Sequence, residues 1–163
     1  MCVRVDGCEV LLGNRRLMSD REVAVSEDVE AVLLRLEEDG KTATLLAVDR
    51  LLTAIVAVAD TVKDHARDAV TDLRGDGIEV VMLTGDNQRT ATAIARQLGI
   101  DRVIAGVVPQ DKAREIQRLR DAGEVVAMIG DGINDAPALA AADVGIAMGA
   151  SGATVSSGGR FSL

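Results

Sequence analysis

The chain has 163 residues, which is enough for one domain or for parts of two. It carries 18 Lys and Arg against 26 Asp and Glu, and this net charge of −8 argues against a nucleic-acid binder, which needs basic side chains to neutralise phosphates. Hydrophobic residues make up 48% of the chain, so it can build a packed core. With one Phe and neither Trp nor Tyr, that core must be aliphatic, and a stacking surface for single-stranded nucleic acid is excluded.

The sequence predicts neither a membrane span nor a signal segment. Its longest apolar stretch, Leu51 to Ala59, contains Thr53 and is far shorter than the roughly 20 residues of a spanning helix. Cys2 and Cys8 do not match a zinc pattern, and His65 is the only histidine. We expect both cysteines to be reduced thiols, as in a cytosolic setting, and a disulfide across neighbouring strands is the alternative.

Residues 1–59 are predicted to form antiparallel strands with helices, as in an α+β domain. Residues 2–12 alternate in polarity around Asp6-Gly7, which predicts a hairpin. Gly13 to Met18 is expected to form a tight break that leads into a short helix, and a longer helix begins at the N-cap Ser26 and ends near Gly40. Two more strands follow, over 42–48 and 52–58.

Near Asp60 the pattern changes to alternating helices and strands, which predicts a doubly wound parallel sheet over 60–149. The strands are apolar throughout, as strands buried on both faces should be. The expected helices cover 63–74, 90–98, 111–122 and 135–142, and the expected strands cover 78–83, 103–105, 125–129 and 144–148. The tail from 150 to 163 is rich in Gly and Ser without periodicity, so we expect it to be disordered or aberrant.

Two polar, glycine-rich clusters follow strands of the predicted sheet, at the edge where open parallel sheets bind ligands. They are Thr84-Gly85-Asp86-Asn87 and the run from Gly130 to Asp135. Glycines let a phosphate approach backbone N–H groups, and a threonine hydroxyl can donate to its oxygens. Asp131 and Asp135 suit Mg²⁺, which takes one or two carboxylates together with phosphate oxygens.

Lys112 begins the intervening helix and could offset phosphate charge at the same edge, so the pattern indicates a phosphoryl-transfer site. Plainer interpretations stay open for two of these features. The Thr84 segment is also a normal turn and N-cap, and Lys112 is also a normal solvated surface residue. The run Gly-Asp-Gly-Ile-Asn-Asp-Ala-Pro from Gly130 is much harder to explain as structure alone.

These motifs resemble the phosphorylation domain of P-type ATPases, cation pumps of the haloacid dehalogenase superfamily, and most of all the copper and zinc types. The segments that carry the resemblance are Thr84 to Asn87, Pro109-x-x-Lys112, Gly130 to Pro137, Gly13 to Met18 and Ala57 to Lys63. It covers about residues 3–149. It implies a partial nucleotide-binding domain over 1–59 and a haloacid-dehalogenase-like parallel sheet over 60–149, from which the central, nucleophile-bearing strand is missing.

The resemblance also implies roles for the matching residues. Gly13 and Asn14 would line the ATP site, and Asp60 would sit at the hinge and help to position nucleotide or a neighbouring loop. The transferred phosphoryl group would be held by Thr84 and Gly85, with Asp86 behind them and Lys112 offsetting its charge. Asp131 would bind Mg²⁺ directly. Asn134 and Asp135 would order the site around the ion without binding it directly. The implied cofactors are therefore Mg²⁺ and ATP.

The family's nucleophile is the Asp of an Asp-Lys-Thr-Gly-Thr segment, and this sequence has no such run. The His-Pro and Gly-x-Gly elements, the actuator domain and the membrane helices are also missing from it. We therefore expect a cytoplasmic catalytic fragment of an ATP-driven heavy-metal pump of the cell membrane, inactive in isolation, with the rest of the pump as its partner and the transported metal bound elsewhere. The alternatives are a stand-alone haloacid-dehalogenase-type hydrolase and a non-catalytic nucleotide-binding module.

The missing central strand leads to one expectation about the fold. In the superfamily that strand lies between the two that correspond to 80–83 and 125–129, so their inner edges would lack a partner. Either these two strands pair directly, or the gap stays open and the isolated chain self-associates or becomes molten.

Overall fold

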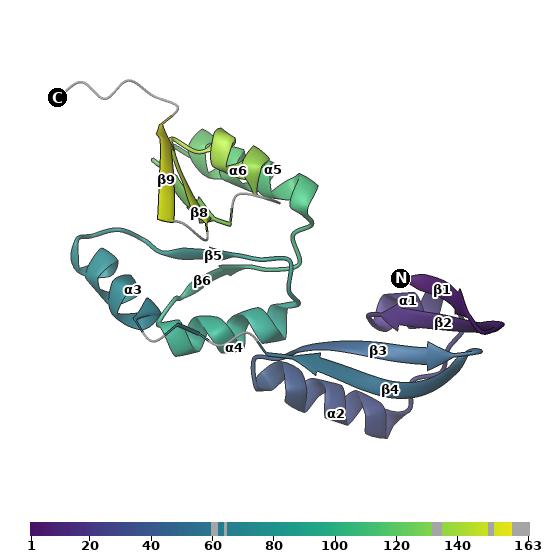
Figure 1. Cartoon of the computed structure of the whole chain (residues 1–163). Coiled ribbons are helices and arrows are strands. Elements are labelled where there is room, and N and C mark those ends of the chain that lie inside the picture. The colour runs from purple at the N-terminus through teal and green to yellow at the C-terminus, as the bar shows by residue number, and fades with distance from the viewer. Residues whose placement is uncertain (60–61, 64, 132–134, 150–151, 158–163) are drawn as a thin grey trace. The chain divides into compact units, whose positions relative to one another are not determined.

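The computed structural model describes residues 1–59, 62–63, 65–131, 135–149 and 152–157 (Figure 1). The chain forms two compact units, Met1–Ala105 and Gly106–Leu163. This division does not follow the domain boundary predicted near residue 60, which stays a prediction. No described helix is long and apolar enough to cross a membrane.

The first unit opens with a four-stranded antiparallel sheet in the order β1-β2-β3-β4. Its strands are β1 (Cys2–Val5), β2 (Cys8–Gly13), β3 (Thr42–Val48) and β4 (Leu51–Val58). The predicted hairpin is confirmed: Asp6 and Gly7 both have positive φ, at 50° and 86°, as a tight two-residue turn between twisted strands requires.

Helices α1 (Arg15–Asp20) and α2 (Glu27–Glu38) pack on this sheet. The helix α2 is confirmed, whereas α1 begins earlier than expected, inside the predicted break, because Asn14 caps it. Ser26 caps α2, because its hydroxyl accepts a hydrogen bond from the amide of Val29. Met18 of α1 and Leu33 of α2 are buried with Val23 and with three strand residues, Leu11, Leu45 and Ala47. The core of this part is aliphatic, as the composition required.

The two cysteines are free thiols, which agrees with the expectation of reduced residues. The hairpin register pairs Cys2 with Leu11 and Cys8 with Val5. Because neither cysteine faces the other across the strands, the alternative of a cross-strand disulfide is wrong.

The first unit continues with α3 (Ala66–Gly75), β5 (Val81–Leu83), α4 (Gln88–Leu98) and β6 (Arg102–Ile104). β5 and β6 form a two-stranded parallel sheet, and Gly99 ends α4 in the left-handed conformation. The strand expected over 78–83 is shorter because β6 offers only three residues for pairing, and Ile78 is exposed.

The second unit contains α5 (Pro109–Asp121), β7 (Ala127–Gly130), α6 (Ala136–Ala141), β8 (Val144–Gly149) and β9 (Gly152–Ser157). β7 and β8 are parallel, and β9 lies antiparallel to β8. Residues 152–157, expected to belong to a disordered or aberrant tail, form the strand β9 instead of being disordered. Ladder hydrogen bonds come from the backbone, so the free edge of β8 can pair with a segment that has no polarity pattern. The remaining tail residues lie outside the described part.

The α/β class with parallel strand pairs and a preceding antiparallel sheet is confirmed. Among the described residues, β5 and β7 belong to different sheets. Because β5 lies in the first unit and β7 in the second, direct pairing of these two strands, one of the two outcomes expected for the missing central strand, stays a prediction. Self-association and a molten state stay predictions.

Candidate phosphoryl and nucleotide site

The Thr84–Asn87 segment follows β5 and forms a turn, which we call the phosphate loop after the role predicted for it. The Thr84 hydroxyl donates to Oδ2 of Asp86 at 2.9 Å and accepts from the Asp86 amide at 3.1 Å. Thr84 and Asp86 are half-buried, whereas Gly85 is exposed. A small exposed residue between two fixed polar side chains leaves the loop backbone open to an anion.

Asn87 ends the phosphate loop and caps α4. Its side-chain oxygen accepts from the amides of Arg89 and Thr90, both at 3.0 Å, and its amide group donates to the Thr90 hydroxyl. The plainer interpretation of this segment, a turn with an N-cap, is therefore correct for Asn87. It does not conflict with a phosphate role for Thr84 and Gly85, whose groups the cap does not use.

Lys112 and Asp135 meet in the second unit. The Lys112 ammonium lies 2.6 Å from Oδ1 of Asp135, with side chains only 16% and 12% exposed. Lys112 stands on the first turn of α5 and Asp135 directly precedes α6, after β7. The interpretation of Lys112 as a solvated surface residue is therefore wrong, because a mostly buried ammonium persists only when it is paired.

Gly130, the last residue of β7, makes room for Asp135. A Cβ atom built at Gly130 would lie 2.6 Å from Oδ2 of Asp135 and 2.9 Å from its Cβ. No real side chain tolerates such distances. The first glycine of the Gly-Asp-Gly run is thus required for the carboxylate to lie over the end of the strand.

Asp131 directly follows β7 and is exposed, and its carboxylate fits a hard cation. Within the described residues no group of three acidic, histidine or cysteine side chains could hold a metal by itself. Asp135 already binds Lys112, so the chain's own oxygens fit Mg²⁺ only when it is shared with phosphate oxygens. Asn134 and Asp60, predicted from the resemblance, lie outside the described residues.

Gly13 and Asn14 lie where β2 ends and α1 begins. Asn14 caps α1, with its side-chain oxygen accepting from the Leu17 amide at 3.1 Å. Gly13 is required by packing, since a Cβ there would lie 2.5 Å from Cδ2 of Leu17. Asn14 is exposed and its side-chain amide group is not used by the cap. The nucleotide role of both residues stays a prediction.

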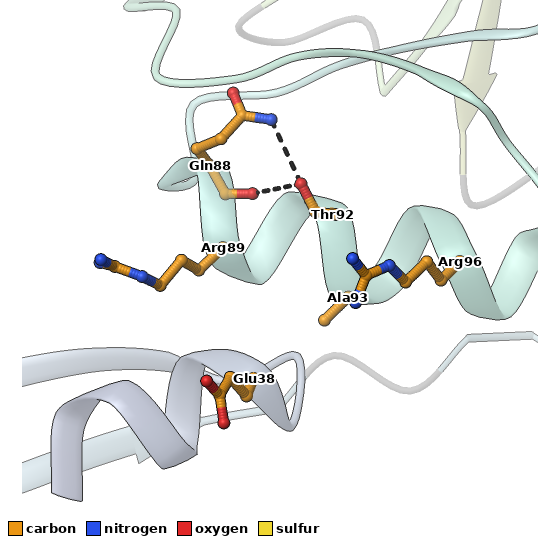
Figure 2. A pocket seen from close by; sticks show the side chains of 6 residues that line it. All are labelled: Glu38, Gln88, Arg89, Thr92, Ala93 and Arg96. Carbon is orange, nitrogen blue, oxygen red and sulfur yellow. Dashed lines mark hydrogen bonds between the residues drawn. The ribbon is translucent and has the colours of Figure 1, made fainter. Parts of the chain in front are cut away.

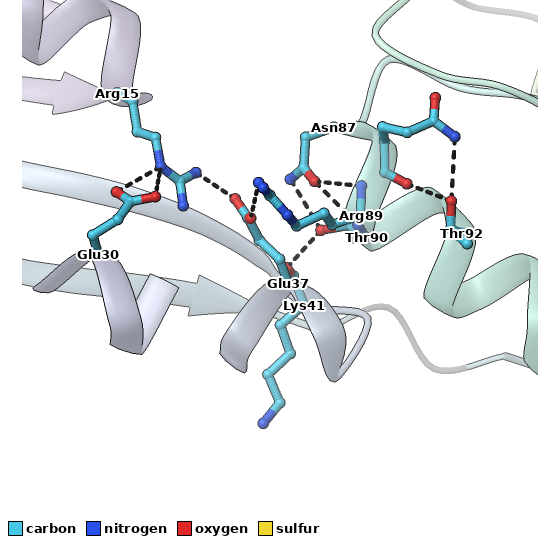
Figure 3. A network of polar contacts seen from close by, with 9 residues as sticks. Arg15, Glu30, Glu37, Lys41, Asn87, Arg89, Thr90 and Thr92 are labelled. Atoms are coloured by element: carbon cyan, nitrogen blue, oxygen red, sulfur yellow. Dashed lines mark hydrogen bonds and ion pairs between the residues drawn. The ribbon is translucent and has the colours of Figure 1, made fainter. Parts of the chain in front are cut away.

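Sequence reasoning missed a polar network centred on Glu37, in the last turn of α2 (Figure 3). Glu37 is 1% exposed, and it pairs with Arg15 at 2.5 Å and Arg89 at 3.6 Å. Arg15 also pairs with Glu30 at 2.8 Å, which lowers the pKa of the Glu30 carboxyl and raises that of the guanidinium. In the sequence, Glu37 stands in an acidic run that reads as a solvated face, so no local signal could reveal its burial.

A shallow pocket lies on the surface of α4 (Figure 2). None of the predicted site residues lines it. Its lining residues are Glu38, Gln88, Arg89, Thr92, Ala93 and Arg96.

Comparison with known families shows to which family this chain belongs. The model of the family described as haloacid dehalogenase-like hydrolase matches residues 4–143. The chain belongs to this family of hydrolases. That membership agrees with the strand-end positions of Thr84 and Asp135 described above.

Curated relatives support the narrower resemblance to heavy-metal P-type ATPases. The copper-exporting P-type ATPases of Staphylococcus aureus strains JH9 and Newman are 55% identical over 145 residues. The match covers 89% of this chain but 18% of each relative, so the chain spans about a fifth of their length.

Solved structures of ATPases are also similar to this chain. A zinc-transporting PIB-type ATPase in its E2.Pi state is 34% identical, with a TM-score of 0.56 over 91% of this chain and 23% of that chain. The catalytic domain of the CPx-ATPase CopB-B is 23% identical, with a TM-score of 0.57 over 88% of this chain and 48% of that domain, and it shows the fold alone.

Proposed function

We propose that this chain is part of the cytoplasmic ATP-hydrolysing region of a heavy-metal cation pump of the copper and zinc type. The observation that carries the proposal is the mostly buried Lys112–Asp135 ion pair at the carboxyl end of β7. A stable fold does not need such a pair, because apolar residues of the same volume would be as good or better. Its position at a strand end, next to Asp131, fits a site that handles phosphate.

Each residue has a role that its surroundings support. Asp135 holds the Lys112 ammonium in one place, so that its positive charge is ready for the oxygens of a transferring phosphoryl group. In the first unit, the amide of the exposed Gly85 is a donor suited to phosphate oxygens, and so is the Thr84 hydroxyl once it releases Asp86. Asp131 is the carboxylate offered to Mg²⁺, which when bound neutralises charge on the phosphoryl group. Asn14, with Gly13 beside it, offers nucleotide the side-chain amide group that the cap does not use.

A substitution experiment tests this proposal. In the S. aureus copper-exporting ATPase, the matching 145 residues are replaced by those of this chain, and phosphoenzyme formation from ATP is measured in membranes. We expect the chimera to form an acid-stable phosphoenzyme. Lys112→Ala in the chimera should abolish it, whereas Arg118→Ala, an exposed residue of the same helix with no assigned role, should not.

The alternatives predict other results. A stand-alone hydrolase or a non-catalytic module of the same family would leave the chimera folded and inserted but unable to form a phosphoenzyme. That outcome would overturn the proposal. Copper dependence of the chimera's activity would reflect the host's own membrane helices, so it is not used as a readout.

A further inference from the structure

The end of α2 and the start of β3 contact the phosphate loop and the beginning of α4 at three points. The Thr42 hydroxyl donates to Oδ1 of Asp86 at 3.0 Å. The Thr90 hydroxyl donates to the carbonyl oxygen of Lys41 at 3.0 Å, and Arg89 pairs with Glu37 (Figure 3). All three contacts lie within the first unit. They join the part of the chain that carries Asn14 to the part that carries Thr84.

Asp86 is the centre of this contact because both of its carboxylate oxygens are engaged. Oδ1 accepts from Thr42, and Oδ2 accepts from the Thr84 hydroxyl. A threonine hydroxyl has a single hydrogen, so Thr84 cannot give it to Asp86 and to a phosphoryl oxygen at once. The orientation of the Asp86 carboxylate therefore determines to which group the Thr84 hydroxyl donates its hydrogen bond.

Glu37 connects the contacting segment to α1 and α4. Its side chain is 1% exposed and pairs with Arg15, next to Asn14, and with Arg89, on α4. A buried carboxylate needs such partners. The Thr90 hydroxyl bound to Lys41 is also fully buried. Thr42 directly follows this anchored stretch and is held at a fixed place beside Asp86.

We infer that Thr42, which lies outside the phosphate loop, is a positioning residue for it. By holding one oxygen of Asp86, Thr42 fixes the carboxylate that orients the Thr84 hydroxyl, and it links the loop to the segment anchored by Glu37. This inference rests on the proposed phosphate role of the loop. Without Thr42 the Asp86 carboxylate is free to turn toward the exposed Gly85, where its negative charge opposes a phosphate.

The test uses the full 163-residue chain labelled with ¹⁵N. Three variants are compared: Thr42→Val removes the hydroxyl at constant shape, Thr42→Ser restores it, and Thr44→Val makes the same change two residues along β3. Hydrogen exchange of the Gly85 and Asp86 amides is measured, and the loop is then titrated with inorganic phosphate. Circular dichroism confirms that each variant is folded.

We expect Thr42→Val to speed exchange of the loop amides and to weaken phosphate binding about fivefold, the usual effect of one lost hydrogen bond. Thr42→Ser should restore both values, and Thr44→Val should leave both unchanged. Equal exchange in Thr42→Val and the unsubstituted chain would overturn the inference, as would tighter phosphate binding. If phosphate shifts no loop amide in the unsubstituted chain, the proposed phosphate role fails, and the exchange comparison still decides the positioning role.

Discussion

The Lys112 ammonium lies 2.6 Å from Oδ1 of Asp135; Lys112 belongs to α5, which begins at Pro109, and Asp135 directly precedes α6, which begins at Ala136. Both groups are mostly buried, so each charge depends on the other for its stability. The pair thus joins α5 to the end of β7 and also supplies the chemistry expected of a phosphate site. These two consequences can be separated by experiment.

Removing one partner of this pair should destabilise the second unit. Lys112→Met or Asp135→Asn leaves a buried charged or polar group without its partner, which we expect to cost about 3 kcal/mol in the free energy of unfolding. The double variant should cost clearly less than the sum of the two. Urea unfolding followed by circular dichroism measures this, and additive losses would contradict the pairing.

The space over Gly130 gives a second prediction. Gly130→Ala would place a methyl group 2.6 Å from Oδ2 of Asp135, so the carboxylate must move and its pair with Lys112 must loosen. We expect a loss of about 1–3 kcal/mol in the free energy of unfolding. Gly75→Ala is the matched control, because nothing lies within 4 Å of that Cβ position and its φ is not positive. A neutral Gly130→Ala would show that Asp135 does not need this space.

The parts of the fold that could be predicted are those that depend on a few residues adjacent in the sequence. Asp6-Gly7 specified its hairpin turn, and Ser26 and Gly99 marked the ends of helices. Strand lengths were less predictable, since β5 is only as long as its partner β6. The strand β9 was missed because pairing at a sheet edge uses backbone groups and needs no side-chain pattern.

In the candidate site, too, the residues of local motifs could be predicted and the contacts between distant residues could not. Thr84, Lys112 and Asp135 were found from motifs, and the structure adds the contacts Thr84–Asp86 and Lys112–Asp135. Glu37 and Thr42 were not found, because their partners lie more than 20 residues away in the sequence. Long-range polar pairs of this kind leave no trace in hydrophobic periodicity or in motif spacing.

Two substitutions separate the capping role of Asn14 from its proposed nucleotide role. Asn14→Asp keeps the oxygen that accepts from the Leu17 amide, so stability should be unchanged. Asn14→Ala removes it and should cost about 1 kcal/mol. If the side-chain amide binds nucleotide, both variants should weaken the ATP-induced chemical-shift changes in the chain. Unchanged ATP titration of Asn14→Asp would limit Asn14 to its role as a cap.

Asp143 predicts a dependence of stability on pH. The Val126 amide donates to its carboxylate at 3.0 Å and Arg120 pairs with it at 2.9 Å, so its pKa is lowered below the ordinary 3.8. A lowered folded-state pKa stabilises the fold above pH 4, and this stabilisation is lost as the pH falls through the folded-state value.

Asp143→Asn should therefore flatten the decline of unfolding free energy between about pH 5 and pH 2. Glu124→Gln, which removes an exposed negative charge from the same unit, is the control. Urea unfolding at several pH values provides the comparison. Equal acid sensitivity in Asp143→Asn and the unsubstituted chain would show that the Asp143 contacts do not matter for stability.

The last prediction concerns catalysis by the 163-residue chain alone. An aspartyl-phosphate needs a carboxylate nucleophile, and the sequence contains no Asp-Lys-Thr-Gly-Thr run to supply it. Asp135 is held by Lys112 and Asp86 by Thr84 and Thr42, so neither offers a free carboxylate to the γ-phosphate. Incubation with γ-labelled ATP and Mg²⁺, followed by acid quench, should leave no label that hydroxylamine removes. Stable labelling would show that an aspartate of this chain is a nucleophile. If the label were then lost in an Asp131→Asn variant, that nucleophile would be Asp131, the exposed carboxylate after β7.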